Sequence, residues 1–321
     1  MKSFEYSAPK NLKDATALLS DTWGKTEILA GGTDLVTALK QRLTEPDRVV
    51  SLKNVAELKG IRSRSGGLAI GAMTTLGDLI ADANIKKNFP SVVTAVQNLA
   101  SPQLLSVGTV GGDLCQRPRC WFFRNGLGLL AQQGNTSLVR EGDNRYHAIF
   151  ATDGPALFVS ASSLGPAFIA LGAEITAAGP GGKTRKISAS EFFRSPKNET
   201  ERETALKPNE ILTEVFVPMR GLKNGTYEIR HRHGMDWPYV TASVAFGGRS
   251  GSEPRVVLGH VASTPWVASS AARLLSAGKV DETAATRCGE AAVEGAKPLS
   301  KNAYKTQMVK TAVKRAVLAA A

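Results

Sequence analysis

The sequence Ile28-Leu29-Ala30-Gly31-Gly32-Thr33-Asp34-Leu35 decides how the N-terminal part of this chain folds. The β-prone run 26–29 leads into two adjacent glycines, and a helical pattern resumes at Leu35. This order predicts a strand, a tight glycine turn and the start of a helix. Glycine adopts positive φ and lets a ligand approach the main chain, so successive N–H groups in such a turn can converge on an anion such as a pyrophosphate.

A second segment repeats this chemistry downstream. Gly108-Thr109-Val110-Gly111-Gly112-Asp113-Leu114 again combines a hydroxyl, an apolar residue, two glycines and an acid. One glycine pair alone is weak evidence, because glycines serve many kinds of turn. Two such segments in one chain together predict two anion-binding loops.

The length and composition indicate an ordinary globular protein of several domains. A chain of 321 residues exceeds the usual size of a single core, and we expect units at 1–55, 56–220 and 221–321. Hydrophobic residues make up 42% and charged residues 21%, which is typical of soluble proteins. Residues 1–19 carry several charges, so they predict neither a signal peptide nor a membrane span.

The net charge of +12 fits a nucleic acid, an acidic partner subunit or an anionic cofactor. The basic residues are scattered, with short clusters such as Arg117/Arg119/Arg124, and lack the aromatic-interleaved pattern of nucleic-acid modules. We therefore expect no nucleic-acid binding. The cysteines and histidines show neither a disulfide framework nor a metal-binding spacing, so we predict a reduced compartment and no metal site. These residues are Cys115, Cys120, Cys288, His147, His231, His233 and His260.

The hydrophobic periodicity divides the chain into three groups of elements. Residues 4–52 predict a βαβαβ unit, and residues 61–218 predict strands at 61–67, 68–75, 173–176, 184–187 and 210–218 with helices between them. The glycine-rich stretch 179–182 superficially suggests a phosphate-binding loop, but a strand follows it, which favours a hairpin tip. Residues 114–150 lack periodicity, and their aromatic side chains indicate an ordered functional loop.

The C-terminal part reads as a separate α+β domain of three strands followed by three helices. The expected strands span 225–231, 240–247 and 256–261, and the expected helices span 266–277, 282–295 and 302–320.

Together these segments resemble the FAD-binding (medium) subunit of the molybdenum hydroxylases, the family of xanthine, aldehyde and carbon monoxide dehydrogenases. The run 116–121, Gln-Arg-Pro-Arg-Cys-Trp, is similar to bacterial aldehyde oxidoreductase FAD subunits. The resemblance implies an α+β fold, with a two-lobed FAD-binding domain of the vanillyl-alcohol-oxidase (PCMH) type and a C-terminal α+β domain. The segments that carry it are 30–35, 71–75, 109–114, 261–266 and 297–300.

The resemblance also assigns FAD-binding positions. It places both glycine segments on the pyrophosphate, residues 72 and 74 on a strand beside the adenine and ribose, and an acid of the C-terminal domain near the flavin. It implies no catalytic residue. The assigned positions are Leu29, Ala30, Gly31, Gly32, Thr33, Asp34, Leu35, Ala72, Thr74, Thr109, Gly111, Gly112, Asp113, Leu114 and Asp236.

Three departures from the family pattern stand out. Leu105-Ser106 replaces an Arg-Asn pair, and Ser163 replaces an acid that the family places on the ribose side of FAD, which predicts weaker FAD binding. The similar branch carries a [4Fe-4S] cluster, which needs four thiolates. Cys120 matches one of them and residues 125–140 contain none, so we expect no cluster.

The resemblance implies an electron-transfer subunit of a heteromeric complex. Its partners would be a molybdopterin-binding large subunit and a [2Fe-2S] small subunit, and its FAD would pass electrons from the iron-sulfur centres to an external acceptor. The alternatives are a stand-alone flavin oxidoreductase and a scaffold subunit depleted of its cofactor. The expected location is the cytoplasm, or the periplasm by co-export with a partner.

Overall fold

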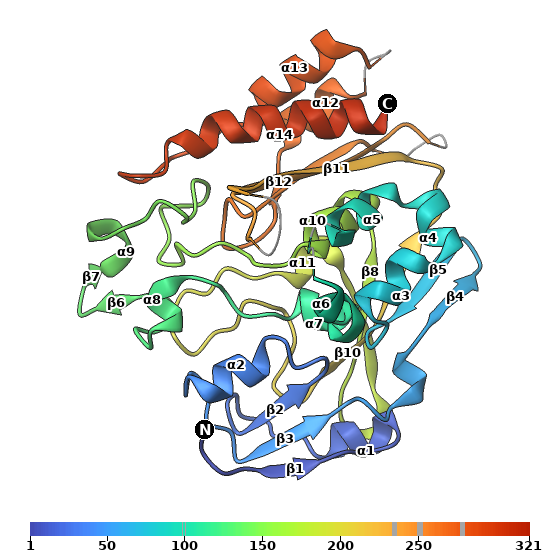
Figure 1. The fold of residues 1–321 in the computed structure, drawn as a ribbon, viewed down its shortest axis with the longest axis vertical. Coiled ribbons are helices and arrows are strands. Elements are labelled where there is room, and N and C mark those ends of the chain that lie inside the picture. The colour runs from blue at the N-terminus through green and yellow to red at the C-terminus, as the bar shows by residue number, and fades with distance from the viewer. Residues whose placement is uncertain (98, 100, 233–235, 249–252, 277–279) are drawn as a thin grey trace.

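The computed structural model describes residues 1–321 except 98, 100, 233–235, 249–252 and 277–279. In the described residues, three larger sheets follow one another along the long axis of the molecule (Figure 1). The N-terminal sheet lies at one end, and helix α14 crosses the other end. The mixture of helices and strands agrees with the predicted α+β class.

The N-terminal unit is a small parallel sheet of order β1-β3-β2. Parallel neighbours need crossover connections, and two helices supply them, which confirms the predicted βαβαβ order. The first glycine turn follows the carboxyl end of β2, where helix α2 begins. The elements are β1 (Glu5–Ser7), α1 (Leu12–Ala17), β2 (Thr26–Leu29), α2 (Leu35–Lys40) and β3 (Arg48–Ser51).

The middle sheet is antiparallel, with the order β4-β5-β10-β8-β9. The hairpin between β8 and β9 closes over a short 3₁₀ turn at Pro180–Gly182, which confirms the hairpin interpretation of the glycine-rich stretch. The strands are β4 (Ile61–Arg64), β5 (Gly67–Gly71), β8 (Glu174–Ala178), β9 (Thr184–Ser188) and β10 (Ile211–Pro218).

Helix α10 lies at the centre of the molecule, and every one of its residues is buried. It touches the C-terminal sheet as well as the middle one, because a Cβ on Gly259 would lie 2.8 Å from Cγ of Pro166. The helices of this unit are η1 (Ala56–Leu58), α3 (Leu76–Ala81), α4 (Ala83–Asn88), α5 (Pro90–Gln97), α6 (Pro102–Val107), α7 (Val110–Leu114), α10 (Leu164–Leu171) and α11 (Ala189–Phe192).

The aperiodic segment 114–150 is ordered around two small apolar clusters of its own. Phe123, Leu129, Leu130 and Phe158 form one of them, and residues 131, 139 and 157 belong to the other. Its short elements are α8 (Trp121–Arg124), β6 (Gln132–Gln133), β7 (Thr136–Ser137) and α9 (Leu138–Glu141).

The C-terminal unit has one more strand than the sequence predicts. Trp266 pairs with Leu258 and stacks on Phe150 at 4.9 Å between ring centroids, so the expected helix from 266 begins only at Ser269. Tertiary packing here overrides the helical pattern. The elements are β11 (Lys223–Ile229), β12 (Val240–Phe246), β13 (Arg255–Gly259), β14 (Trp266–Val267), α12 (Ser269–Leu274), α13 (Glu282–Ala291) and α14 (Tyr304–Ala320).

A buried polar cluster fixes the segment 144–148 to the C-terminal unit. Lys305 Nζ donates to the carbonyl oxygens of Tyr146, His147 and His260 at 3.1, 3.1 and 2.8 Å. Asn302 Nδ2 donates to the carbonyl oxygens of residues 144, 147 and 148. Burial lowers the pKa of Lys305 to about 7. Each of these donors satisfies carbonyls that would otherwise be stranded away from water.

The burial of His260 predicts that the stability of the protein depends on pH. It is buried with a φ of 62°, its Nδ1 lies 3.1 Å from Thr241 Oγ1, and its Nε2 has no partner among the described residues. Burial lowers its pKa from 6.5 to about 3, so between these values the unfolded chain binds the extra proton. Acidification through this window should therefore lower the free energy of unfolding, by at most ~1.4 kcal/mol per pH unit.

The variant H260N tests this, because asparagine tolerates positive φ and does not titrate in this range. We expect wild type to lose more thermal stability than H260N between pH 7 and pH 5, measured by circular dichroism. Equal losses in the two proteins would assign the acid sensitivity to other groups.

Candidate functional site

The first glycine turn presents backbone donors that the described residues leave unbound. Gly32 has a φ of 81°, and the N–H groups of Gly31, Gly32 and Thr33 have no acceptor in the described part of the chain. Successive free N–H groups at a turn form a concave anion-binding nest. Thr33 is exposed, so the nest opens to solvent.

The two glycine segments lie against each other, as the sequence predicts. A Cβ on Gly31 would lie 1.9 Å from the carbonyl oxygen of Val107, so only glycine permits this approach. A Cβ on Gly112 would lie 4.0 Å from Cβ of Ala30. Leu29 and Leu35 flank the nest at the end of β2 and the start of α2.

The second glycine segment differs from the predicted open loop. It begins helix α7, and Thr109 Oγ1 caps the helix by accepting from Gly112 N at 3.1 Å. Val110 N donates to Thr74 O at 3.0 Å, and Gly111 N donates to Ala72 O at 2.8 Å. These three N–H donors are already satisfied by the protein, so in this structure they hold α7 in place.

Ala72 and Thr74 lie beyond the strand on which the sequence places them. Strand β5 ends at Gly71, because the carbonyls of residues 72 and 74 turn to accept from α7. Thr74 Oγ1 donates to Gly60 O at 3.0 Å, and both side chains are buried. Their position makes them supports of α7.

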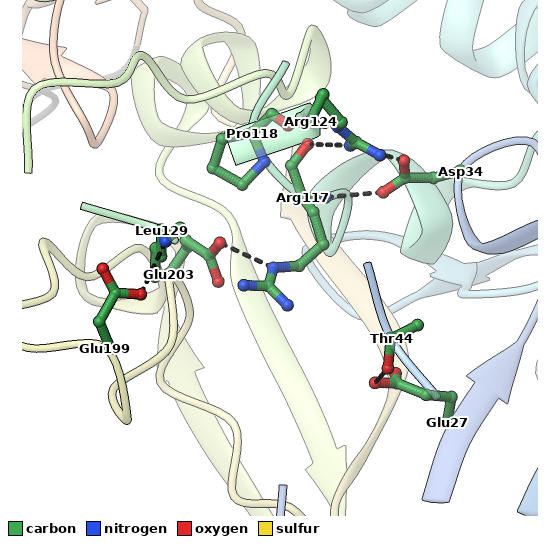
Figure 2. A network of polar contacts seen from close by, with 9 residues as sticks. All are labelled: Glu27, Asp34, Thr44, Arg117, Pro118, Arg124, Leu129, Glu199 and Glu203. Carbon is green, nitrogen blue, oxygen red and sulfur yellow. Dashed lines mark hydrogen bonds and ion pairs between the residues drawn. The ribbon is translucent and has the colours of Figure 1, made fainter. Parts of the chain in front are cut away.

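Asp34 points toward the segment 117–124 (Figure 2). Its carboxylate accepts from Arg117 N and from Arg124 Nη2, both at 2.8 Å, and lies 3.2 Å from Arg119 Nη1. Arg119 Nε and Arg124 Nη1 are buried without an acceptor in the described residues. Two guanidinium groups against one carboxylate leave surplus positive charge next to the residue that follows the nest.

In the sequence these arginines form a basic cluster, and Arg117 and Arg119 also belong to the run 116–121 that resembles aldehyde oxidoreductase FAD subunits. Their alternation with Pro118 and Cys120 marks the segment as unusual, but it does not predict that Asp34 is the acid that pairs with Arg119 and Arg124.

Two further carboxylates hold the same segment from the connection between α11 and β10 (Figure 2). Glu203 accepts from Arg117 Nε at 2.7 Å. Glu199 accepts from Leu129 N and Leu130 N at 2.7 and 2.8 Å. Together with Asp34 they tie the segment to both neighbouring parts of the chain.

Asp113 faces the core. Its carboxylate accepts from Ser162 Oγ at 2.6 Å, from Leu164 N at 2.9 Å and from Ser163 N at 3.2 Å, so it caps the start of α10. Burial raises its pKa, and these hydrogen bonds oppose the shift. Its neighbour Leu114 is likewise part of the hydrophobic core.

Ser163, expected to mark a lost acid, stands at this same cap. Its side chain is 0% exposed and its Oγ has no partner among the described residues. Position 163 therefore supplies only a backbone N–H to this cap, and the carboxylate comes from Asp113.

Asp236 lies between β11 and β12, next to Met235, which falls outside the described residues. Its carbonyl accepts from Arg230 Nη1 at 3.0 Å, and its own carboxylate accepts from Trp237 N at 3.0 Å. The Trp237 ring lies under the guanidinium of Arg119, 4.8 Å from its centroid. Asp236 is thus connected to the first glycine segment through Trp237 and Arg119.

The residues of this region do not fit an iron-sulfur cluster. Cys120 Sγ lies 3.1 Å from His147 Nε2. Burial raises the pKa of Cys120 and lowers that of His147 to about 4, so at neutral pH the pair is a thiol and a neutral imidazole. No three His, Cys, Asp or Glu side chains of the described residues are grouped to hold a metal. Apolar side chains fill the segment instead.

Comparisons with known proteins agree over the whole chain. Residues 2–220 match the family model described as the FAD binding domain in molybdopterin dehydrogenase, and residues 225–320 match the CO dehydrogenase flavoprotein C-terminal domain. The carbon monoxide dehydrogenase medium chain of Hydrogenophaga pseudoflava is 29% identical over 99% of this chain and 96% of its own length. The aldehyde oxidoreductase FAD-binding subunit PaoB of Escherichia coli is 28% identical, over 97% and 96%.

Solved structures show the same fold. A chain of quinoline 2-oxidoreductase from Pseudomonas putida superimposes with a TM-score of 0.76 at 26% identity, covering 100% of this chain and 98% of that one. A chain of carbon monoxide dehydrogenase from Hydrogenophaga pseudoflava gives a TM-score of 0.75 at 27% identity, covering 99% and 96%. These matches confirm the predicted fold class.

An acid swap tests the α10 cap. S163D should place a second carboxylate beside Asp113, and D113N should weaken the cap, each lowering the free energy of unfolding by about 1–3 kcal/mol. The double variant D113N/S163D moves the acid across the contact and should recover most of the loss in urea unfolding. S163A, which removes the unpartnered hydroxyl, is the neutral control. Additive losses in the double variant would show that the two positions do not share one acid.

Iron analysis tests the ligand set. We expect the purified chain, after anaerobic reconstitution with iron and sulfide, to retain no stoichiometric iron, because the segment 114–150 offers two thiols, Cys115 and Cys120, where a cluster needs four. C120A should behave identically. Near-stoichiometric cluster iron that disappears in C120A would contradict this reading.

Proposed function

This chain belongs to the family of FAD-binding domains in molybdopterin dehydrogenases, and from that premise we propose that it is the electron-transferring FAD subunit of a heteromeric molybdenum-dependent hydroxylase. The observation that carries the proposal is the nest at Gly31–Thr33, whose N–H groups have no acceptor in the described chain, followed by Asp34 with the guanidinium groups of Arg119 and Arg124 on its carboxylate. Free N–H groups and surplus positive charge suit a pyrophosphate, which presents several anionic oxygens.

The residues fit FAD in a definite division of roles. The N–H groups of the first segment would receive the pyrophosphate, while Thr109 and Gly111 keep the supporting helix in place. Asp236 and Trp237 would stand at the flavin end. Bound FAD supplies the redox chemistry, and the protein supplies binding, orientation and electrostatics. No side chain of this chain has to act as a general acid or base.

We further propose the partners. The relatives are named as a medium chain and as FAD-binding subunits of dehydrogenases, which supports a complex with a molybdopterin-binding large subunit and a [2Fe-2S] small subunit. The net charge of +12 suits acidic partner surfaces. No helix among the described residues is long and apolar enough to cross a membrane. We propose that the chain stays in the cytoplasm, or that it reaches the periplasm by co-export with a partner subunit.

The scaffold alternative rests on Ser163 and on Leu105-Ser106. Neither position supplies an N–H group of the nest at Gly31–Thr33, and for this reason we favour a chain that binds FAD. A stand-alone flavin oxidoreductase would need an acid-base group of its own at the flavin end. The electron-transfer role that we propose needs no such group.

Spectroscopy and isolation test the proposal. We expect the purified protein to show the two absorption bands of oxidised flavin, or to acquire them on titration with FAD. Riboflavin, which lacks the pyrophosphate, should bind far more weakly. A native complex isolated through this chain should contain molybdopterin and iron-sulfur centres. A colourless chain that binds no FAD, or a complex without these centres, would overturn the proposal.

Substitution of Gly32 tests the nest directly. A Cβ there would lie 3.2 Å from Val36 Cγ2 and 3.3 Å from Leu29 Cδ1, at a φ that alanine adopts with strain. G32A should weaken FAD binding about tenfold or more, in line with ~1–3 kcal/mol of strain and shifted donors. Fluorescence titration of the apoprotein measures the change.

Gly66 provides a matched control. Its φ is 80°, nothing lies within 4 Å of a Cβ built there, and it sits in the β4–β5 turn. G66A should lose similar thermal stability while keeping its affinity for FAD. Equal FAD affinities in G32A and G66A would remove the nest from the binding site.

A further inference from the structure

Arg119 touches all three parts of the fold. Its Nη1 lies 3.2 Å from Asp34 Oδ1 in the first glycine segment, and its Nη2 donates to Gln116 Oε1 at 3.0 Å just after α7. Its guanidinium carbon lies 4.8 Å from the ring centroid of Trp237 in the C-terminal unit. One side chain therefore connects the candidate pyrophosphate nest with an aromatic ring on another domain.

A chain of hydrogen bonds links the Arg119 guanidinium to the core through Gln116. Gln116 Nε2 donates to Asp113 Oδ1 at 3.0 Å, and Asp113 is the buried cap of α10. This chain of contacts anchors Arg119 to the hydrophobic core. Its Nε is buried and has no acceptor among the described residues. Burial lowers the pKa of Arg119, but an arginine remains charged at any physiological pH.

Trp237 offers an unused aromatic surface at the end of this chain. The residue is 42% exposed although a cation covers one side of its ring. Exposed indoles with a fixed orientation are favourable platforms for planar ligands, because stacking costs little further ordering. The Arg119 contact supplies the fixed orientation.

We propose that Arg119 and Trp237 form the wall of the site for the flavin ring, with Arg119 positioning the indole and giving that site positive charge. This rests on the proposed function. The ring of FAD is joined to its pyrophosphate by a short ribityl chain, and Arg119 spans from the nest's own acid to Trp237. A guanidinium beside the ring also stabilises negative charge that develops on it.

Ligand dissection tests the wall. ADP carries the pyrophosphate without the flavin ring, so W237A should weaken FAD about tenfold, as expected for the loss of one stacking contact, and leave the affinity for ADP unchanged. Visible circular dichroism of bound FAD should change in W237A and remain close to wild type in W237F. Equal weakening of FAD and ADP by W237A would overturn the proposal.

Sulfite binding tests the charge. The sulfur lone pair of sulfite forms a bond to flavin N5, and the electron pair displaced onto the ring leaves it negative, so adduct affinity reports nearby positive charge. R119Q should raise the sulfite dissociation constant about tenfold, and R119K, which keeps the charge, should restore most of the affinity. An unchanged constant in R119Q would overturn the assigned role of Arg119.

Arg145 supplies the matched control. It is an exposed arginine whose guanidinium lies 5.9 Å from the Tyr146 ring and pairs with Asp143, and among the described residues it makes no hydrogen bond or ion pair with either glycine segment. R145Q should leave FAD, ADP and sulfite affinities unchanged. Wild-type protein that binds no FAD would defeat the proposed function itself, whereas FAD bound equally by wild type and W237A would defeat only the ring site.

Discussion

The close approach of Gly31 to the carbonyl of Val107 is the constraint on which the site depends. A side chain at this position would collide with backbone that has no freedom to move, because the next residues cap and form α7. The contact presses the end of a parallel β-strand unit against an antiparallel one. The N–H groups of residues 31–33 stand at this contact, and no part of the described chain accepts from them.

The acids that follow the two glycine pairs bind other groups of the protein, so a ligand at the nest would meet backbone donors. Asp34 neutralises part of an arginine group, and Asp113 caps α10. If either carboxylate faced the nest, its negative charge would oppose a pyrophosphate. Directing both inward keeps the open side of the site positive, and it fastens the glycine segments to the elements behind them.

Carboxylates and apolar side chains hold the segment 114–150 in place. Glu199 binds two successive N–H groups, Glu203 binds Arg117, and apolar side chains fill the space between. Cys120 is a protonated thiol beside a neutral imidazole. Glu203 also pairs with Arg117, and Asp34 pairs with Arg119 and Arg124, so the contacts that order the loop also hold its arginines.

Local pattern in the sequence was enough for the βαβαβ unit, the hairpin at 180–182 and most elements of the C-terminal unit, because periodicity and glycine placement report backbone shape directly. The family resemblance, in turn, predicted that the two glycine segments lie at one site. The early end of β5, the strand β14 and the inward direction of Asp113 depend on partners distant in the chain. Asp34 meets Arg124 across 90 residues, and no local pattern encodes such a pairing. The sequence by itself determined which residues could form the nest. Only the tertiary structure decided which donors stay free, because that depends on where every competing acceptor lies.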